Sequence, residues 1–417
     1  MQKIISSILY IISLLILTLS LAQNFSDTLS SEPLFQSSLE DNISFKNKTI
    51  TAAELGVTKN TAPPSGMNAK SYCLIEADSK RILAAKDQNN RMPMASTTKI
   101  MTCILALENG RPDDIVTVSD YAASMPDVQL GMKSGDTFYL KDLLYSLMLE
   151  SHNDTAVAIA EHIGGSVEGF ARMMNDKAAE LGCTDTNFVT PNGLDAKEHY
   201  TTAYELCTIA SYAIKNQGFL DIISTPSHQF SNCSGTSNYQ VYNKDLFLTS
   251  YDGALGIKTG FTGNAGYCFC GAAKRGDLTL ISSVLACGWP PHKTYKWLDT
   301  KKLMDYGFNS FKNVTLSADS VLSPITVYDG QCTSVRLRRT GNTSFSIPLT
   351  KSDTIKICYE IPDCLTAPVR QGDIIGYENY LINDKTFVKI PLAAQNDVKK
   401  IDMKYIMHVM SKLFFSM

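Results

Sequence analysis

The sequence predicts an α+β domain, in which a cluster of helices packs on an antiparallel sheet, followed by a smaller all-β domain. Apolar residues follow helical spacing through much of 96–214, whereas the flanking segments 71–85 and 254–287 have the pattern of strands. From about residue 311, short strand patterns alternate with Gly, Asn and Asp turns, and helical spacing returns only near residue 397. A chain of 417 residues has room for two or three domains.

The N-terminal residues 1–22 have the features of a signal peptide. Lys3 precedes an apolar stretch that ends in Ser20-Leu21-Ala22, which fits the small-x-small cleavage pattern. An uncleaved membrane anchor is the alternative, because the apolar run is nearly long enough to span a bilayer. We therefore predict an exported, extracytoplasmic protein. Residues 23–66 are rich in Ser, Thr, Asn and acidic groups, and we predict a polar spacer with room for a short strand or turn.

Residues 67–310 form the first predicted domain. Its sheet begins with a hairpin over 71–85, and a helix that starts near Ser96 ends at Asn109-Gly110, since Ser favours helix starts and Gly favours helix ends. The remaining predicted elements are helices over 140–149, 155–163, 170–181 and 202–214, strands over 254–260, 266–273 and 278–287, and a final helix over 293–306.

The second predicted domain is a β-sandwich over residues 311–396, and the tail 397–417 is predicted to be an amphipathic helix. Apolar residues of the tail share one broad face, and its lysines lie largely off that face. Such a helix suits a membrane surface, and packing on the β domain is the alternative.

Charge and cysteine content exclude some classes of function. The net charge of −3 gives no basic excess for binding nucleic acid. The chain has 11 cysteines, an odd number, so at least one of them is unpaired. The sequence does not decide whether the others form disulfides. Cys268-Phe269-Cys270 lacks Cys-x-x-Cys spacing and has no accompanying His pair, so we expect no metal site, and we expect no cofactor.

The most informative stretch is Ser96-Thr97-Thr98-Lys99, at the start of an apolar helix. Residues three apart share a helix face, so the Lys99 amine lies within reach of the Ser96 hydroxyl. A Lys buried among apolar neighbours can lose its proton near neutral pH and act as the base that activates a serine nucleophile. Alone, the pattern is more often a helix cap followed by a solvated lysine.

Two further stretches change this interpretation. Ser151-His152-Asn153 follows about 55 residues later, and Lys258-Thr259-Gly260 follows about 105 residues after that. With Ser-x-x-Lys they make up the Ser-x-x-Lys, Ser-x-Asn, Lys-Thr-Gly set of penicillin-recognising serine acyl enzymes.

With these motifs the chain resembles the low-molecular-weight penicillin-binding proteins, which are serine-type D-Ala-D-Ala carboxypeptidases. The resemblance covers about residues 67–395 and includes the loop 188–195 and Ala265-Gly266-Tyr267. It implies a penicillin-binding/β-lactamase-like domain, a membrane-proximal β domain and an amphipathic anchor at the outer face of the cytoplasmic membrane. It also implies peptidoglycan stem peptides ending in D-Ala-D-Ala as partners and β-lactams as inhibitors.

The chemistry of the motifs gives the catalytic residues their expected roles. Ser96 attacks the carbonyl between two D-alanines, and Lys99 accepts its proton. Ser151 relays a proton to the leaving D-Ala amine. The backbone N–H groups of Ser96 and Phe261 are expected to form the oxyanion hole, one at a helix N-terminus and one after the Lys-Thr-Gly strand.

The other motif residues are expected to bind substrate. Asn153 holds the acyl side-chain amide, and Lys258 with Thr259 binds the terminal carboxylate through charge-assisted contacts. Gly260, in the same motif, allows the backbone to approach closely.

Some residues depart from the family's common pattern. His152 stands where Gly or Ala is frequent, and we expect an exposed or capping His, with a modulating role beside the serine as the alternative. Asn192-Gly193 stands where some members carry His-Gly. The family's extra carboxylate-binding Arg has no obvious counterpart, and Lys293 is a loose candidate.

Three other interpretations stay open. A class A β-lactamase shares the three motifs, but it needs a Glu in the loop after Ser-x-Asn, which the loop 188–195 lacks, and it has no appended β domain. A non-catalytic penicillin- or peptidoglycan-binding module is the second. In the third, Ser96 is a plain helix cap in a structural protein.

Overall fold

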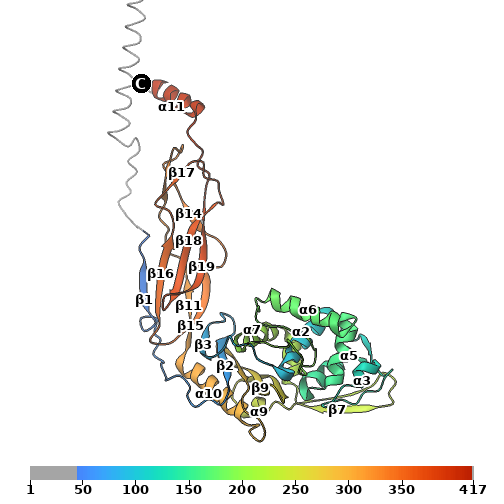
Figure 1. Cartoon of the computed structure of the whole chain (residues 1–417). Helices are drawn as coiled ribbons and strands as arrows, with labels where there is room; N and C mark the ends of the chain where they lie inside the picture. Colours follow the sequence, from blue (N-terminus) through green and yellow to red (C-terminus); the bar gives the residue numbers. More distant parts are fainter. Residues whose placement is uncertain (1–44, 416–417) are drawn as a thin grey trace, which may run out of the picture.

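The structure is a computed structural model that describes residues 45–415, and the predicted signal peptide lies outside the described residues. The described chain forms a domain of helices and an antiparallel sheet and a second, elongated β domain, which meet where helix α10 leads into strand β11 (Figure 1). The predicted fold class is confirmed.

The five-stranded sheet of the first domain joins strands from both ends of that domain's sequence. Its order is β3 (Ile82–Lys86), β2 (Ser71–Glu76), β10 (Leu278–Leu285), β9 (Gly266–Arg275) and β8 (Ala254–Thr262). Each neighbouring pair is antiparallel. Strand β8, which carries the Lys-Thr-Gly motif, therefore lies at one edge of the sheet.

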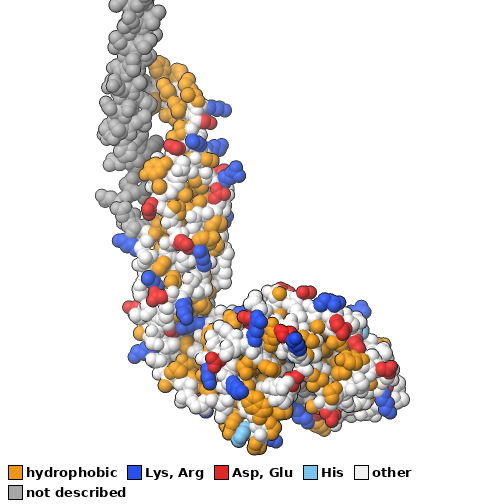
Figure 2. All heavy atoms as spheres, in the orientation of Figure 1, with side chains coloured by type: hydrophobic (Ala, Val, Ile, Leu, Met, Phe, Trp, Pro, Cys, Tyr) orange, Lys and Arg blue, Asp and Glu red, His pale blue; other side chains and the backbone are white. Residues whose placement is uncertain are grey.

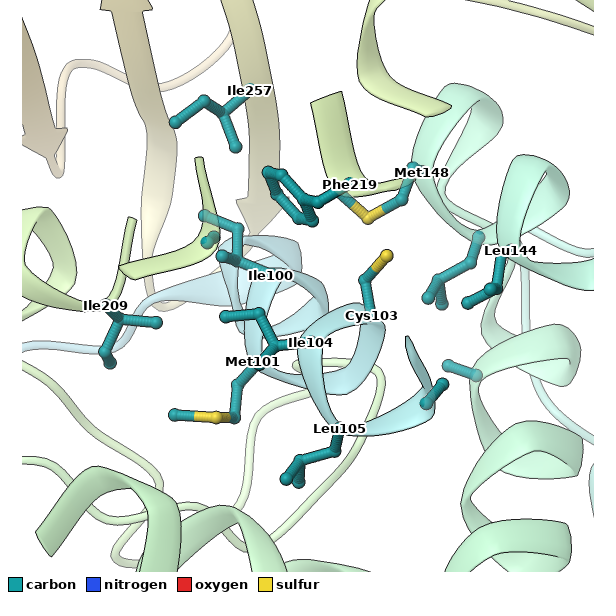
Figure 3. Close-up of a cluster of buried hydrophobic side chains, with 14 of the residues drawn as sticks. Ile100, Met101, Cys103, Ile104, Leu105, Leu144, Met148, Ile209, Phe219 and Ile257 are labelled. Atoms are coloured by element: carbon teal, nitrogen blue, oxygen red, sulfur yellow. The ribbon is translucent and has the colours of Figure 1, made fainter. Parts of the chain in front are cut away.

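Helix α2 (Lys99–Asn109) runs through the centre of the helical cluster (Figure 3). All residues from Lys99 to Ala106 are buried, as expected of a helix that is apolar on every side. The helices of this domain that surround α2 or lie further out are α3 (Asp120–Ala123), α4 (Leu140–Tyr145), α5 (Asn153–Gly164), α6 (Val167–Glu180), α7 (Ala203–Ala213), α8 (Gln217–Ser224) and α9 (Phe247–Ser250). Two small hairpins complete this side, β4 (Ile115–Thr117) with β5 (Thr137–Tyr139) and β6 (Ser227–Ser231) with β7 (Asn238–Tyr242).

Helix α10 (Tyr295–Ser310) covers the opposite face of the sheet. Its Leu303, Met304 and Phe308 pack in one cluster with Leu74 of β2 and Leu280 of β10. The sheet is thus buried on both faces, and the helical cluster holds one end of β8 against the start of α2.

Two short helical turns differ from the predicted regular helices. The turn before α2, Ala95–Thr98, is a 3₁₀-helix, so Ser96 lies in a tighter turn than an α-helix would give. Residues Ser146–Glu150 form a π-helical turn between α4 and α5, directly before the second motif. Single π-turns of this kind are frequent at functional sites.

The second domain is built from β strands. A five-stranded sheet has the order β1 (Lys48–Thr51), β16 (Thr354–Glu360), β18 (Ile374–Ile382), β19 (Lys385–Ala394) and β14 (Leu337–Arg339). Two smaller sheets pair β11 (Lys312–Ser317) with β15 (Ser344–Leu349), and β12 (Ile325–Tyr328) with β13 (Ser334–Val335) and β17 (Cys364–Thr366). Their apolar faces form two buried clusters.

Strand β1 lies within residues 23–66, where the prediction left room for a short strand or turn, but it belongs to the sheet of the second domain. Lys48–Thr51 pairs antiparallel with β16, more than 300 residues later in the sequence (354 against 51), and Ala52 and Val57 are buried in the core of the β domain. The N-terminal segment therefore completes the second domain before the chain enters the first.

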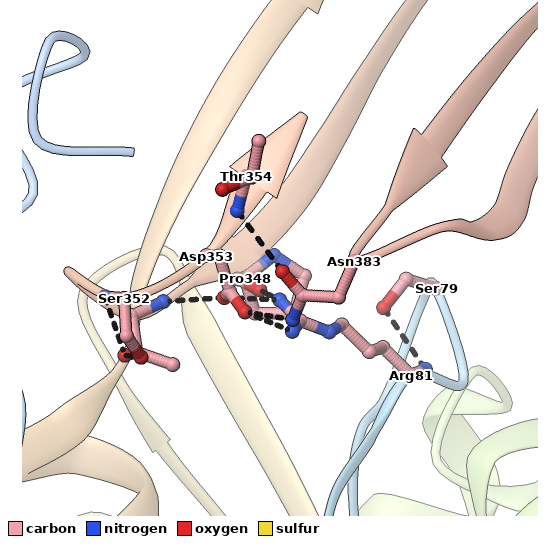
Figure 4. A network of polar contacts seen from close by, with 8 residues as sticks. Ser79, Arg81, Pro348, Ser352, Asp353, Thr354 and Asn383 are labelled. Carbon is pink, nitrogen blue, oxygen red and sulfur yellow. Dashed lines mark hydrogen bonds and ion pairs between the residues drawn. The ribbon is translucent and has the colours of Figure 1, made fainter. Parts of the chain in front are cut away.

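The contact between the domains includes Arg81, in the turn before β3. Its guanidinium donates to both carboxylate oxygens of Asp353 at 2.9 Å and to the Pro348 carbonyl (Figure 4). It also lies over the Phe311 ring. Burial favours the neutral form of Asp353, but the Arg81 contacts and the Thr350 N–H hold the pKa of this carboxyl below its usual value. A charged, nearly buried pair thus ties the two domains together.

The tail forms helix α11 (Met403–Phe415), which has no buried residue. The predicted helix is present; its Tyr405 hydroxyl donates to the Gln331 carbonyl of the β domain at 3.1 Å, and Tyr405 and Val409 are half-buried. Among the helices of residues 45–415, none is both long and apolar enough to cross a bilayer. The 11 cysteines all fall within the described residues and are free thiols.

Candidate active site

Ser96 lies in a tight turn held from both sides. The Thr97 hydroxyl donates to the Met94 carbonyl at 2.6 Å, and the Thr98 hydroxyl donates to the Ala95 carbonyl at 2.8 Å. Ala95 has a φ of +49°, which is uncommon for a residue other than glycine. This turn leaves Ser96 half-buried while its neighbours Ala95 and Thr97 are buried.

The Lys99 amine is fully buried next to the Ser96 hydroxyl. Lys99 Nζ lies 3.1 Å from Ser96 Oγ, 2.8 Å from Asn153 Oδ1 and 2.6 Å from the Asn192 carbonyl oxygen. Its side chain is 0% exposed. Burial, and secondly the positive charge of Lys258, hold the Lys99 pKa well below its usual value. A neutral amine at this distance can accept the hydroxyl proton.

The second motif follows the π-helical turn. Ser151 adopts a left-handed conformation with a φ of +72°, and its buried hydroxyl oxygen has no hydrogen-bond partner within residues 45–415. Asn153 is held by its amide, which donates to the Pro126 and Asp127 carbonyls at 3.1 and 3.2 Å, while its Oδ1 accepts from Lys99. The turn therefore presents one free hydroxyl and one oriented amide.

His152 is not the exposed or capping residue that we expected. Its side chain is 4% exposed; Nδ1 lies 2.8 Å from Ser146 Oγ, and Nε2 lies 3.4 Å from Glu150 Oε2. It stands at the N-cap position of α5, but its side chain makes no cap hydrogen bond. Burial lowers the His152 pKa. The imidazole instead packs the π-helical turn against α5, because Ser146 also bonds Thr155.

Strand β8 brings the third motif to the same place. Lys258 is 2% exposed, and burial lowers its pKa to about 8 although Asp245 opposes the shift. Gly260 runs so close to the Ser96 turn that a Cβ on it would stand 2.9 Å from Ser96 N. Phe261 is 43% exposed, and its ring lies 4.6 Å from that of Tyr267 on β9.

The structure therefore brings residues from each of the three motifs together. Lys99 contacts both Ser96 and Asn153, and Gly260 adjoins the Ser96 backbone. The site holds a hydroxyl and two buried amines whose pKa values are both lowered, that of Lys99 strongly.

Some contacts of the site have no signal in the sequence. The Asn192 carbonyl that accepts a hydrogen bond from Lys99 belongs to a loop packed against the Ser96 turn. This loop approaches so closely that a Cβ on Gly193 would stand 2.0 Å from the Ala95 carbonyl oxygen. His199 braces the same turn, since its Nε2 lies 2.9 Å from Thr98 Oγ1. The Thr190-Pro191-Asn192-Gly193 turn marks the loop in the sequence but not these contacts. Lys293, our loose carboxylate candidate, is exposed.

Comparison with known proteins identifies the family. A family model described as D-alanyl-D-alanine carboxypeptidase, peptidase family S11, matches residues 57–288. The chain belongs to this family. A second model, described as the C-terminal domain of penicillin-binding protein 5, matches residues 311–400. The resemblance that the three motifs predicted is confirmed.

Individual members of the D-alanyl-D-alanine carboxypeptidase family are similar over most of the chain. D-alanyl-D-alanine carboxypeptidase DacF of Bacillus subtilis is 31% identical over 341 residues, which cover 80% of this chain and 86% of that protein. DacA of Haemophilus influenzae is 31% identical over 358 residues, covering 83% and 88%. The crystal structure of penicillin-binding protein 5 from Haemophilus influenzae superimposes with a TM-score of 0.68 at 29% identity, covering 82% of this chain and all of that one (100%).

Proposed function

We propose that this member of the D-alanyl-D-alanine carboxypeptidase family removes the terminal D-alanine from peptidoglycan stem pentapeptides through an acyl-enzyme on Ser96. The observation that carries the proposal is the fully buried Lys99 amine 3.1 Å from the Ser96 hydroxyl. A serine is a weak nucleophile until a base takes its proton, and Lys99 is a base with a strongly lowered pKa.

In the acylation step, Ser96 Oγ forms a bond to the carbonyl carbon between the two D-alanines as its proton moves to Lys99. The N–H groups of Ser96 and Phe261 stabilise the oxyanion, and the Gly260 approach to Ser96 supports this pairing. The carbon–nitrogen bond then breaks, and the leaving D-Ala amine takes a proton by way of Ser151. The unpartnered Ser151 hydroxyl is free for such a relay.

Substrate orientation comes from the two remaining contacts. Lys258 and Thr259 bind the terminal carboxylate, which selects the end of a peptide chain. The oriented Asn153 amide holds the acyl side-chain amide. Water finally hydrolyses the ester and frees Ser96.

β-Lactams fit the same site as inhibitors, since they present a carboxylate to Lys258 and a strained carbonyl to Ser96. The loop 188–195 carries no Glu to activate a deacylating water, and its Asp195 accepts a hydrogen bond from Thr262 at 2.8 Å. The penicilloyl ester should therefore be cleared slowly, which distinguishes this chain from the class A β-lactamases.

The location that we propose is the outer face of the cell membrane, after export by the signal sequence at 1–22. Large apolar side chains gather over α11 at the far end of the β domain (Figure 2), among them Met403 at 72%, Phe414 at 79% and Phe415 at 86% exposed. Lys404 and Lys412 flank this surface. An apolar face with basic neighbours supports a helix lying in an anionic membrane surface.

The experiment that tests the proposed reaction is release of D-alanine from a pentapeptide ending in D-Ala-D-Ala. The protein that begins after residue 22 should release one D-alanine per peptide, and S96A should release none. A folded wild-type protein that binds the peptide without releasing D-alanine would indicate a binding module instead.

A further inference from the structure

The Lys-Thr-Gly lysine is buried without a strong local partner. Lys258 is 2% exposed, and its Nζ donates to the carbonyl oxygen of the next residue, Thr259, at 3.3 Å. An ammonium group has three N–H donors, so this single long bond leaves it poorly satisfied. A buried cation in this state needs an opposite charge nearby or it loses its proton.

Asp245, just before α9, is the buried acid on this side of the sheet. It is 8% exposed, and its Oδ1 accepts from the Phe247 N–H at 2.9 Å. Its other oxygen, Oδ2, is buried and has no hydrogen-bond partner of ordinary geometry among residues 45–415, although the Ile257 N–H of β8 is near enough to this carboxyl to lower its pKa. The structure thus contains a buried carboxylate oxygen and a buried ammonium, each with unused bonding capacity.

Lys258 lies on strand β8, and Asp245 adjoins the same strand two residues earlier. Asp245 Oδ2 lies 3.3 Å from the position that a Cβ on Gly256 would occupy. Gly256 borders a register irregularity of β8 and has a φ of +100°; it pairs with Ala272 of β9 as Lys258 pairs with Cys270, so the two residues stand about 7 Å apart along the strand. Any side chain at residue 256 would intrude on the carboxylate, and the glycine leaves it facing the strand.

Three other charged or titratable side chains interact electrostatically with this pair. Lys99 at the start of α2 and His152 before α5 interact with Lys258, and Lys296 of α10 interacts with Asp245. Asp245 is the acidic group whose charge opposes the loss of the Lys258 proton.

We propose that Asp245 is a positioning residue whose carboxylate keeps the buried Lys258 charged for binding the substrate's terminal carboxylate, and thereby keeps Lys99 available as the base. The inference rests on the proposed function, in which Lys258 binds that carboxylate. It deepens the proposal by assigning the second lysine its countercharge.

The two steps follow from the electrostatics of the buried lysines. Burial raises the Asp245 pKa to about 6 and lowers the Lys258 pKa to about 8, so both groups are charged between these values. The Lys258 charge in turn lowers the Lys99 pKa. If Asp245 were neutral, the Lys258 pKa would fall further, and at alkaline pH the site would lose its carboxylate-binding cation.

The test compares D245N with D252N across the pH range. Asn keeps the size of the side chain and an oxygen for the Phe247 N–H, but removes the charge. Asp252 lies beyond the other end of α9, in the connection to β8, with its side chain 90% exposed, so D252N removes the same charge from the surface. Each variant is normalised by the fraction that benzylpenicillin titrates, which counts folded sites.

We expect the alkaline limb of kcat/KM for D-alanine release to move to lower pH by at least half a unit in D245N and to stay in place in D252N. The loss in D245N should appear mainly as a KM raised at least threefold at pH 8, and should shrink toward pH 5.5, where Asp245 of the wild type is itself protonated. A loss that is constant with pH, or an equal shift in D252N, would overturn the inference.

Failure of the proposed function would look different. If the wild-type protein released no D-alanine, the same pH comparison would be made on the rate of penicilloyl-enzyme formation, since benzylpenicillin also carries a carboxylate. A D245N-specific alkaline loss there would support the role of Asp245 without the peptidase reaction, and equal pH profiles would reject it.

Discussion

A methyl group at Gly260 should separate the nucleophile from the strand that completes its site. A Cβ at this position would stand 2.9 Å from Ser96 N, 3.0 Å from Ala95 Cβ and 3.1 Å from Thr97 N. Ordinary contact between such atoms begins near about 3.5 Å, so β8 and the Ser96 turn must part by roughly half an ångström. Both are backbone segments, which leaves no flexible side chain to absorb the shift.

This displacement acts on the oxyanion hole, because its two N–H groups come from Ser96 on one side and Phe261 on the other. Losing one oxyanion donor costs about 10²–10³ in rate, and a misplacement of about 1 Å can cost about 10²-fold. We therefore expect G260A to form the penicilloyl-enzyme about 10²-fold more slowly than the wild type. The rate is measured by quenching the reaction at set times and determining the acylated fraction by intact-mass spectrometry.

A matched control is available three residues later. Gly263 has no atom within 4 Å of an added Cβ, and we expect G263A to acylate at the wild-type rate. Thermal unfolding of both variants checks that they fold. G260A acylating within about threefold of the wild type, with an unchanged midpoint, would refute the reasoning.

Three further predictions concern the base, the tail and the domain contact. K99M should slow acylation about 10²–10⁴-fold, since Ser96 then has no general base. A protein lacking 403–417 should stay active but bind anionic vesicles more weakly, because the exposed apolar face and its lysines are gone. R81A should destabilise the protein by up to about 3–5 kcal/mol, because it leaves the Asp353 carboxylate buried without its partner.

The domain contact also has a predicted pH dependence. The Asp353 pKa is lowered in the folded protein, so its contribution to stability is present above the ordinary value of about 3.9 and is lost as the pH falls through the folded value. R81A should therefore lose less stability than the wild type on acidification below about pH 4, measured by urea unfolding.

Each of these predictions has an outcome that contradicts it. Near-normal acylation by folded K99M would remove Lys99 from the role of base. Vesicle binding that is unchanged without the tail would reject the anchor, and insolubility of the shortened protein would indicate that α11 packs on the chain. Equal stability of R81A and the wild type at neutral pH would show that the Arg81–Asp353 pair does not stabilise the contact.

The sequence predicted the features that depend on local pattern and on recognisable motifs. Apolar spacing located α2 and the antiparallel strands, and the three motifs located the chemistry around Ser96 and Lys258. Strand β1 was not located, because it is short, lies in a polar stretch, and finds its partner only through the fold of the distant residues 354–357.

Contacts made by backbone atoms and by buried charges could not be predicted from the sequence either. The Asn192 carbonyl on Lys99 depends on the path of a loop, and any residue could supply that oxygen. The burial of His152 depends on the π-helical turn before it, whose hydrogen-bond pattern is set by packing rather than by apolar spacing. Asp245 has no motif, and only its burial beside β8 relates it to Lys258.

Mapping the benzylpenicillin adduct tests the central claim most directly. After incubation with the antibiotic, intact mass and peptide mapping should show one penicilloyl group, on Ser96, that persists for minutes or longer and is absent from S96A. Rapid penicillin hydrolysis without an adduct would identify a β-lactamase instead. Neither adduct nor hydrolysis, or an adduct on another residue, would contradict the assignment of Ser96 as the nucleophile.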